Sequence, residues 1–118
     1  MFTGKFEKSQ KSPRRVLLRH PAALPLYFTL RAASPYTMVR HESLMQMRDL
    51  IKGVDARKVP GSIVETGCWR GGCAAFMAKV SKKNGSSRTT WMFDSFEGLP
   101  APGEKDKGFF THMRVANT

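Results

Sequence analysis

A glycine-rich turn between a predicted strand and a predicted helix constrains this sequence more than any other feature. Residues 62–66 form a short run rich in β-branched side chains, which favours a strand, and Gly67 ends it. Residues 71–83 then place apolar side chains at helical spacing. After a loop, residues 89–93 favour a second strand, which ends at Asp94. This order predicts the opening of a βαβ unit, whose two strands run parallel.

A further helix is predicted before this unit. Over residues 41–52, Leu44, Met47, Leu50 and Ile51 recur at helical spacing, which we interpret as a core-facing stripe. Gly53 is the predicted stop of this helix. Upstream, prolines at positions 21, 25 and 35 argue against a long helix. We therefore predict an α/β fold in which a helix precedes the βαβ unit.

The 118 residues contain only two predicted strands and one crossover helix. Such a sheet leaves much apolar surface uncovered, because parallel sheets are normally covered on both faces. The regular pattern also stops after Asp94, so we expect a truncated fold. We predict two parts: a basic, flexible arm over residues 1–34 and an incomplete domain over residues 35–118.

Basic residues concentrate in the first third of the chain. Residues 1–40 contain eight Lys or Arg and one Glu, a net +7 of the +11 carried by the whole sequence. Such an arm can bind nucleic acid or another anionic surface, and it can also be a solvated terminus. A small basic nucleic-acid- or anion-binding protein is therefore the alternative function. The solvated terminus is our main interpretation, with no specific nucleic-acid partner.

No segment has the length of a membrane span. The best apolar run, residues 21–30, has ten residues and is interrupted by proline, whereas a span needs ~20 residues. We expect no membrane span and a cytoplasmic location. Cys68 and Cys73 are too few for a disulfide framework or a four-cysteine zinc site. We interpret both as small packing residues.

Residues 65–72, Glu-Thr-Gly-Cys-Trp-Arg-Gly-Gly, favour a ligand at the turn. Glycine lets a ligand approach the main chain closely, and the following helix start offers unpaired N–H groups. Asp94 follows Gly72 by 22 residues, where an acid can accept hydrogen bonds from ribose hydroxyls. The dinucleotide spacing G-x-G-x-x-G and the phosphate-loop pattern are not met. Glu65 suits a cationic group better than a pyrophosphate, which indicates S-adenosylmethionine.

Two segments carry a resemblance to a known family. Residues 65–72, followed by Phe-Asp-Ser-Phe-Glu-Gly-Leu-Pro at 93–100, resemble the macrocin O-methyltransferase family. Residues 35–38 and 59–61 are also similar to family features. The resemblance implies a Rossmann-like class I methyltransferase fold, here partial: the first βαβ unit with its preceding helix. It also implies S-adenosylmethionine-dependent methyl transfer to a hydroxyl of a sugar or natural-product acceptor.

The resemblance also assigns candidate cofactor-binding residues. Glu65 and Gly67 would border the methionine part of the cofactor, and residues 69–72 would shape the turn beside it. Asp94 would hold the ribose, with the next two residues close to the adenosine, and residues 36–38 would fold over the cofactor. The full set is Tyr36, Thr37, Met38, Glu65, Thr66, Gly67, Trp69, Arg70, Gly71, Gly72, Asp94, Ser95 and Phe96.

The resemblance covers less than a full family domain. In the full-length family we expect Mg²⁺, with its aspartate ligands and a general base downstream of the ribose acid. This sequence offers none of those ligands, so we assign no metal site and no catalytic residue. We expect the 118-residue chain to be inactive alone. An inactive methyltransferase remnant and an oligomer of the full-length form both stay open.

Overall fold

The structure is a computed structural model that describes residues 18, 19, 21–98 and 105. Most of the predicted basic arm lies outside the described residues. In chain order the elements are the 3-10 helix η1 (Pro21–Leu26), α2 (Tyr27–Ala33), the 3-10 helix η2 (Ser34–Tyr36), α3 (His41–Ala56), β1 (Ile63–Thr66), α4 (Gly72–Lys83) and β2 (Thr90–Phe93).

The two strands form a parallel sheet, as predicted. Ile63 pairs with Thr90, and Thr66 pairs with Phe93. The crossover helix α4 contacts both strands. Each of these three elements begins one residue later than the sequence predicts and ends where it predicts. The described part of the chain therefore has an α/β arrangement of helices and parallel strands.

Helix α3 does not stop at Gly53 as predicted, and it continues to Ala56. A glycine inside a helix costs only about 1 kcal/mol relative to alanine, which other contacts can offset. Asp55, in the last turn, accepts a hydrogen bond from the Arg88 Nε at 2.6 Å. Arg88 also donates to two carbonyls of the loop over residues 59–61. This network holds the end of α3 against the loop that leads into β2.

The core lies between α2, α3 and α4. Leu30, Leu44 and Phe76 supply one fully buried side chain from each helix. The stripe predicted on α3 is confirmed for Leu44, and Met47 and Ile51 pack partly against the core. The prediction for Leu50 is wrong, because its side chain is 69% exposed. The buried face of α3 is instead formed by His41, Leu44, Met45 and Arg48.

The arm predicted over residues 1–34 does not reach residue 34, because its last part belongs to the core. Leu26, Leu30 and Ala33 are buried there. These three positions follow the spacing of one helix face, so they pack together once the helix forms. The prolines at 21 and 25 lie within η1, and α2 has only seven residues, but η1, α2 and η2 follow one another without a gap, so helical turns are continuous over residues 21–36.

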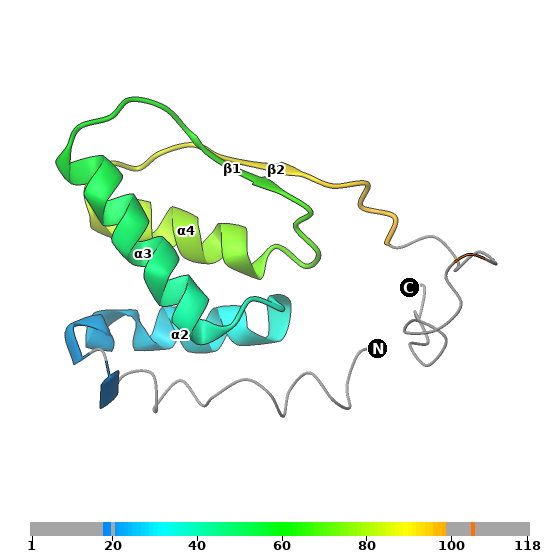
Figure 1. The fold of residues 1–118 in the computed structure, drawn as a ribbon, viewed down its shortest axis with the longest axis horizontal. Helices are drawn as coiled ribbons and strands as arrows, with labels where there is room; N and C mark the ends of the chain where they lie inside the picture. The colour runs from blue at the N-terminus through cyan, green and yellow to red at the C-terminus, as the bar shows by residue number, and fades with distance from the viewer. Residues whose placement is uncertain (1–17, 20, 99–104, 106–118) are drawn as a thin grey trace.

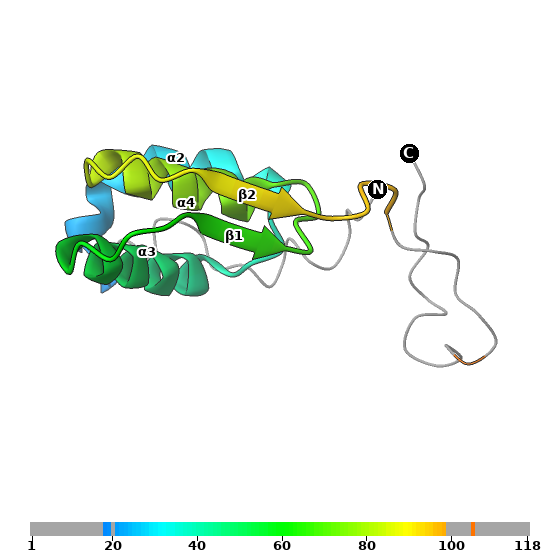
Figure 2. The same cartoon turned by 90° about the horizontal axis from the view of Figure 1, so that it is seen from above.

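The helices of the described chain all lie on one side of the sheet. Figure 1 shows the two strands along one side of the fold, with α3 and α4 beneath them and α2 farther away. Figure 2 shows the same arrangement from above, with both strands in front of α3 and α4. Helix α4 thus lies between the sheet and α2, and its first turn faces the glycine-rich turn.

The start of α4 lies unusually close to η2. A Cβ built on Gly72 would lie 2.5 Å from the carbonyl carbon and oxygen of Tyr36 and 2.8 Å from the Ala33 oxygen. These are backbone atoms, so a side chain there forces the two elements apart. The glycine therefore sets the distance between η2 and the turn, and with it the position of Tyr36.

We predict that Gly72→Ala lowers the free energy of unfolding by about 1–3 kcal/mol, because the added methyl overpacks a backbone contact. Gly53→Ala is the matched control, since Gly53 is also helical and a Cβ there meets nothing within 4 Å. This control is expected to stabilise the protein by about 0.5–1 kcal/mol. Urea unfolding followed by circular dichroism measures both, and equal effects of the two substitutions would contradict the prediction.

Candidate functional site

The turn between β1 and α4 has an unusual backbone. Gly67, Trp69 and Gly71 have φ values of +75°, +47° and +76°, in the left-handed region. The Gly67 N–H donates to the Phe93 carbonyl at 2.8 Å, and the Gly71 N–H donates to the Cys68 carbonyl at 2.8 Å. A Cβ on Gly67 would meet nothing within 4 Å, so the space beside this residue is open. The turn therefore presents accessible backbone at the carboxyl end of β1.

The Asp94 carboxylate holds this turn in place. Its Oδ2 accepts hydrogen bonds from the N–H groups of Cys68 and Trp69, at 2.6 and 3.1 Å. Its Oδ1 accepts the Phe96 N–H at 3.2 Å and lies 3.4 Å from the Ser95 hydroxyl. The Phe96 and Cys68 N–H groups lower the pKa of Asp94, because they favour its charged form. One carboxylate thus joins the glycine turn to the loop after β2.

The sequence predicts that Asp94 contacts a ribose. In the structure the same carboxylate also binds the N–H groups of the glycine turn. Both oxygens already interact with the protein, and Oδ2 has two N–H donors. Oδ1 has one N–H donor and a longer contact to the Ser95 hydroxyl. A carboxylate offers about four lone-pair positions, so Oδ1 is the oxygen with capacity for a further donor. The ribose contact itself stays a prediction.

Glu65 carries a buried oxygen without a hydrogen-bond partner. It is the third residue of β1 and pairs in register with Met92. Its Oε2 is buried and has no partner among the described residues. Burial first, and then a hydrogen bond to the Glu65 carboxylate and the negative charge of that group, raise the pKa of the Cys73 thiol to about 12. A buried carboxylate oxygen is costly unless a donor or a cation compensates it, so Glu65 is a candidate for contact with a cationic ligand.

The two cysteines behave as packing residues, as predicted. Both are free and buried. Burial raises the pKa of Cys68, and its thiol lies 3.4 Å from the Glu65 carbonyl and 3.6 Å from the Phe93 carbonyl. Because the thiolate is the nucleophilic form, raised pKa values keep both thiols unreactive at neutral pH.

Arg70 lies between two aromatic side chains. Its guanidinium carbon is 5.7 Å from the centre of the Tyr36 ring and 5.6 Å from the centre of the Trp69 ring. Both distances are within the range of cation–π attraction. Among the described residues Arg70 has no acidic partner, so its N–H donors are available to an anion. These contacts join Tyr36, which lies before α3, to Trp69 and Arg70 in the turn.

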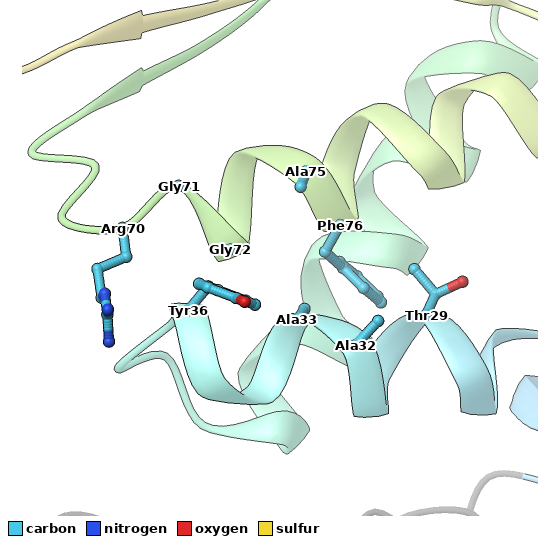
Figure 3. Close-up of a pocket in the computed structure, with 9 residues that line it drawn as sticks. All are labelled: Thr29, Ala32, Ala33, Tyr36, Arg70, Gly71, Gly72, Ala75 and Phe76. Atoms are coloured by element: carbon cyan, nitrogen blue, oxygen red, sulfur yellow. The ribbon is translucent and has the colours of Figure 1, made fainter. Parts of the chain in front are cut away.

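A small pocket opens beside this arginine, between α2, η2 and the start of α4 (Figure 3). Its volume is about 190 Å³. Ligand pockets for drug-sized molecules are typically about 300–1,000 Å³, so this pocket can hold only part of a nucleoside-sized ligand. Figure 3 shows Arg70 and Tyr36 near the turn, with Phe76 and the small side chains of Thr29 and Ala32 farther along the helices. The lining residues are Thr29, Ala32, Ala33, Tyr36, Arg70, Gly71, Gly72, Ala75 and Phe76.

The structure brings the candidate residues together in two groups. Tyr36, Arg70, Gly71 and Gly72 line the pocket. A second group surrounds the carboxyl ends of the strands and consists of Glu65, Thr66, Gly67, Trp69, Asp94, Ser95 and Phe96. Met38 is 44% exposed and lines neither place, while Thr37 is buried and accepts the Val39 N–H at 3.0 Å. The Thr37 side chain therefore supports its own segment.

Sequence reasoning missed the pair that anchors this segment. The Ser34 hydroxyl lies 2.7 Å from the His41 Nε2 and donates to the Leu30 carbonyl at 2.8 Å. His41 is buried at the first turn of α3. The pair therefore joins the two ends of the segment that contains residues 36–38, because Ser34 precedes this segment and His41 follows it. A serine and a histidine seven residues apart across a proline form no known spacing pattern, so the sequence contained no usable signal.

Comparison with known proteins identifies the family. A family model described as macrocin-O-methyltransferase (TylF) matches residues 30–117. The chain belongs to this family. No solved structure matches it.

Three relatives of this chain are O-methyltransferases from species of Streptomyces and Micromonospora. The chain is 40% identical over 81 residues to 8-demethyl-8-(2,3-dimethoxy-alpha-L-rhamnosyl)-tetracenomycin-C 4'-O-methyltransferase of Streptomyces olivaceus. This match covers 68% of the chain and 31% of the relative. The chain is 38% identical over 73 residues to demethyldecarbamoylnovobiocin O-methyltransferase of Streptomyces niveus, covering 61% and 28%. It is 33% identical over 81 residues to mycinamicin III 3''-O-methyltransferase of Micromonospora griseorubida, covering 68% and 32%. The match spans about a third of the length of these relatives.

Within residues 18–19, 21–98 and 105, no group of three or more His, Cys, Asp or Glu side chains is placed to hold a metal ion. Over the same residues, no helix combines the length and apolar character needed to cross a membrane. The nucleic-acid alternative depends mainly on basic residues outside the described ones, and it stays a prediction.

We predict that Asp94→Ala exposes the Cys68 and Trp69 amides to faster hydrogen exchange, because both lose their acceptor. Folding lowers the pKa of Asp94 from its usual value of 3.8. The hydrogen bonds of Asp94 to the turn, which we call the clamp, are therefore complete above pH 3.8 and are lost as pH falls through the lowered pKa. Protection factors from exchange measured by NMR at pH 6 and below check both statements. Glu97→Ala, an exposed acid of the same loop, is the control, and unchanged protection in Asp94→Ala would contradict the clamp.

Proposed function

We propose that this chain carries the S-adenosylmethionine-binding part of an O-methyltransferase that acts on a hydroxyl of a sugar or natural product. The observation that carries the proposal is the buried, unpartnered Oε2 of Glu65 beside an open glycine turn. The relatives support the acceptor class, because the names of all three describe O-methyltransferases of natural products. We propose both the methyl-transfer activity and the hydroxyl acceptor for the whole protein that contains this sequence.

The charge of Glu65 fits the methionine end of the cofactor. S-adenosylmethionine carries an ammonium and a sulfonium, and either compensates a buried carboxylate oxygen. Gly67, two residues later, leaves open space where a side chain would otherwise stand. A pyrophosphate in the same place would meet the negative charge of Glu65. The residues present therefore fit a cationic ligand at this turn.

Arg70 fits the other charged group of the same amino acid. Its guanidinium is held between Tyr36 and Trp69 and lacks an acidic partner among the described residues. Guanidinium groups bind carboxylates through charge-assisted hydrogen bonds. The adjoining start of α4 has no side-chain cap, so its first N–H groups also favour an anion. We assign the cofactor carboxylate to Arg70 and to the residues at 71–72.

Asp94 and the loop after it fit the nucleoside end. The proposal places a ribose hydroxyl at the Asp94 Oδ1, where it would replace the long contact with the Ser95 hydroxyl. Phe96 is 67% exposed beside the same carboxylate, and an exposed ring can stack on a base. Residues 36–38 and Thr66 complete the proposed boundary of the site. These roles are the ones implied by the family resemblance.

When bound, the cofactor supplies an electrophilic methyl group for transfer to a hydroxyl oxygen. This chain's own residues would bind and orient that donor, which contributes to rate by placing the reacting atoms in line. The described residues do not fit Mg²⁺, since they offer no cluster of ligands, and the proposal assigns no step to a metal. No described residue is assigned as the base that would activate the acceptor.

We predict that the chain binds S-adenosylmethionine and that Glu65→Gln weakens this binding about tenfold or more. The expected loss corresponds to one hydrogen bond to a charged group, about 1.5–3 kcal/mol. Isothermal titration calorimetry measures the dissociation constants. Glu97→Gln removes the same charge from an exposed position and is expected to leave the affinity unchanged. Absence of binding, or equal effects of both substitutions, would reject the proposed site.

We also predict that the 118-residue chain transfers no methyl group on its own, because its described residues include a proposed donor site and none that we assign to an acceptor. A radiolabelled methyl-transfer assay with glycosylated natural products as acceptors checks this. Measurable transfer that disappears in Glu65→Gln would refute the prediction and place an acceptor site within these residues.

A further inference from the structure

The helical segment formed by η1 and α2 is apolar on the side that the core does not cover. Leu26, Leu30 and Ala33 of this segment are buried, whereas Leu24 and Phe28 are 66% and 76% exposed. A helix that is apolar on all sides is normally buried on all sides. In the part of the chain that the structure describes, the exposed side chains of this segment therefore lack the cover that such side chains usually have.

Phe28 lies at the centre of this uncovered surface. Arg31 follows it by three residues in α2, a spacing that places both side chains on one helix face, and Arg31 is also exposed. Leu24 precedes Phe28 by four residues, in η1. Figure 1 shows α2 on the far side of α3 and α4 from the two strands. We call Leu24, Phe28 and Arg31 the outer α2 surface.

Positive charges border the outer α2 surface. The Lys83 ammonium donates a hydrogen bond to the carbonyl of Pro25, the residue that follows Leu24. Lys83 is thereby held against η1, although it belongs to the last turn of α4. Arg19 is exposed just before η1 begins. The apolar side chains of the surface therefore have cations near them on two helices.

The sequence adds no negative charge to this region. No Asp or Glu occurs between Glu7 and Glu42, whereas seven Lys or Arg residues do. The whole chain carries a net charge of +11. A partner of this surface must therefore be complementary both to exposed apolar side chains and to positive charge without any negative charge beside it.

We propose that the outer α2 surface docks on an anionic lipid membrane, with Leu24 and Phe28 inserted between the lipids and the nearby cations at the headgroups. Helices that present Leu or Phe beside Lys and Arg lie in the plane of the membrane interface in this way. Each basic residue close to the membrane adds attraction to anionic lipids. The segment lies on the membrane in this proposal and does not cross it.

A nucleic acid fits this surface less well. Single strands bind on aromatic rings on which successive bases stack, and an exposed leucine offers no such platform. The ring of Tyr27 lies 5.4 Å from that of Phe28 at an interplanar angle of 74°, so the two rings do not form parallel stacking platforms. A second copy of the chain is also disfavoured, because two copies of net charge +11 repel one another.

The test mixes the full 118-residue chain with vesicles of phosphatidylcholine and phosphatidylserine, or of phosphatidylcholine alone, and measures co-sedimentation. At about 0.15 M salt we expect binding to the anionic vesicles only, and weaker binding as added salt screens the charges. Leu24→Ser and Phe28→Ser are each expected to weaken binding about tenfold, because each removes one apolar side chain from the membrane. No cofactor is present, so the result is independent of S-adenosylmethionine binding.

The matched control for Leu24→Ser is Leu50→Ser, which makes the same change at a leucine 69% exposed on α3. It is expected to leave vesicle binding unchanged, and circular dichroism checks that every variant folds. Three results would overturn the proposal: no binding to the anionic vesicles, equal weakening by Leu24→Ser and Leu50→Ser, or binding of a single-stranded oligonucleotide that Phe28→Ser weakens while vesicle binding stays unchanged.

Discussion

A single carboxylate connects the glycine turn to the second strand, and the geometry of the site depends on it. Asp94 accepts N–H groups of the turn at one oxygen and of its own loop at the other. These bonds offset the left-handed backbone of Trp69 and Phe96, which for residues with a Cβ costs about 1–2 kcal/mol each. Because Asp94 follows β2 directly, the turn reaches this shape only when β1 and β2 are paired in register.

The helical layer positions the other half of the site. A close backbone contact at Gly72 brings η2 against the start of α4, and the Ser34–His41 pair holds the segment that follows. Tyr36 thereby reaches Arg70, although the two are distant in sequence. The site consequently has one part built by strand pairing and one built by helix packing, and they meet at the turn over residues 67–71.

Two features of the chain are unsatisfied in the same region of the fold. The Glu65 Oε2 is buried without a partner on the side of β1 that faces the helices, and the other side of the sheet exposes Val64 and Trp91. The cationic cofactor that we propose would compensate the buried oxygen of Glu65. A buried charge and an exposed apolar patch are both unfavourable without a partner.

The amino-acid sequence by itself determined the local order of the elements, the parallel strands and the family. Periodicity and glycine placement are local signals, and they predicted β1, α4 and β2 to within one residue. Local signals failed where packing decided. Gly53 did not end α3, Leu50 turned outward, and residues 26–33 joined the core despite the nearby prolines. The choice in each case depended on which neighbours were available to bury a side chain or hold a turn.

The same distinction applies to the site. Sequence spacing indicated that Glu65, Gly67 and Asp94 belong to one ligand site at the ends of the strands. Only the tertiary structure showed that Asp94 clamps the turn, that Arg70 lies between two rings, and that the Glu65 oxygen is unpartnered. Asp94 lies 26 positions from Cys68, and Arg70 lies 34 positions from Tyr36. The geometry of these contacts exists only after the strands pair and the helices pack, because no local pattern specifies a distance across the fold.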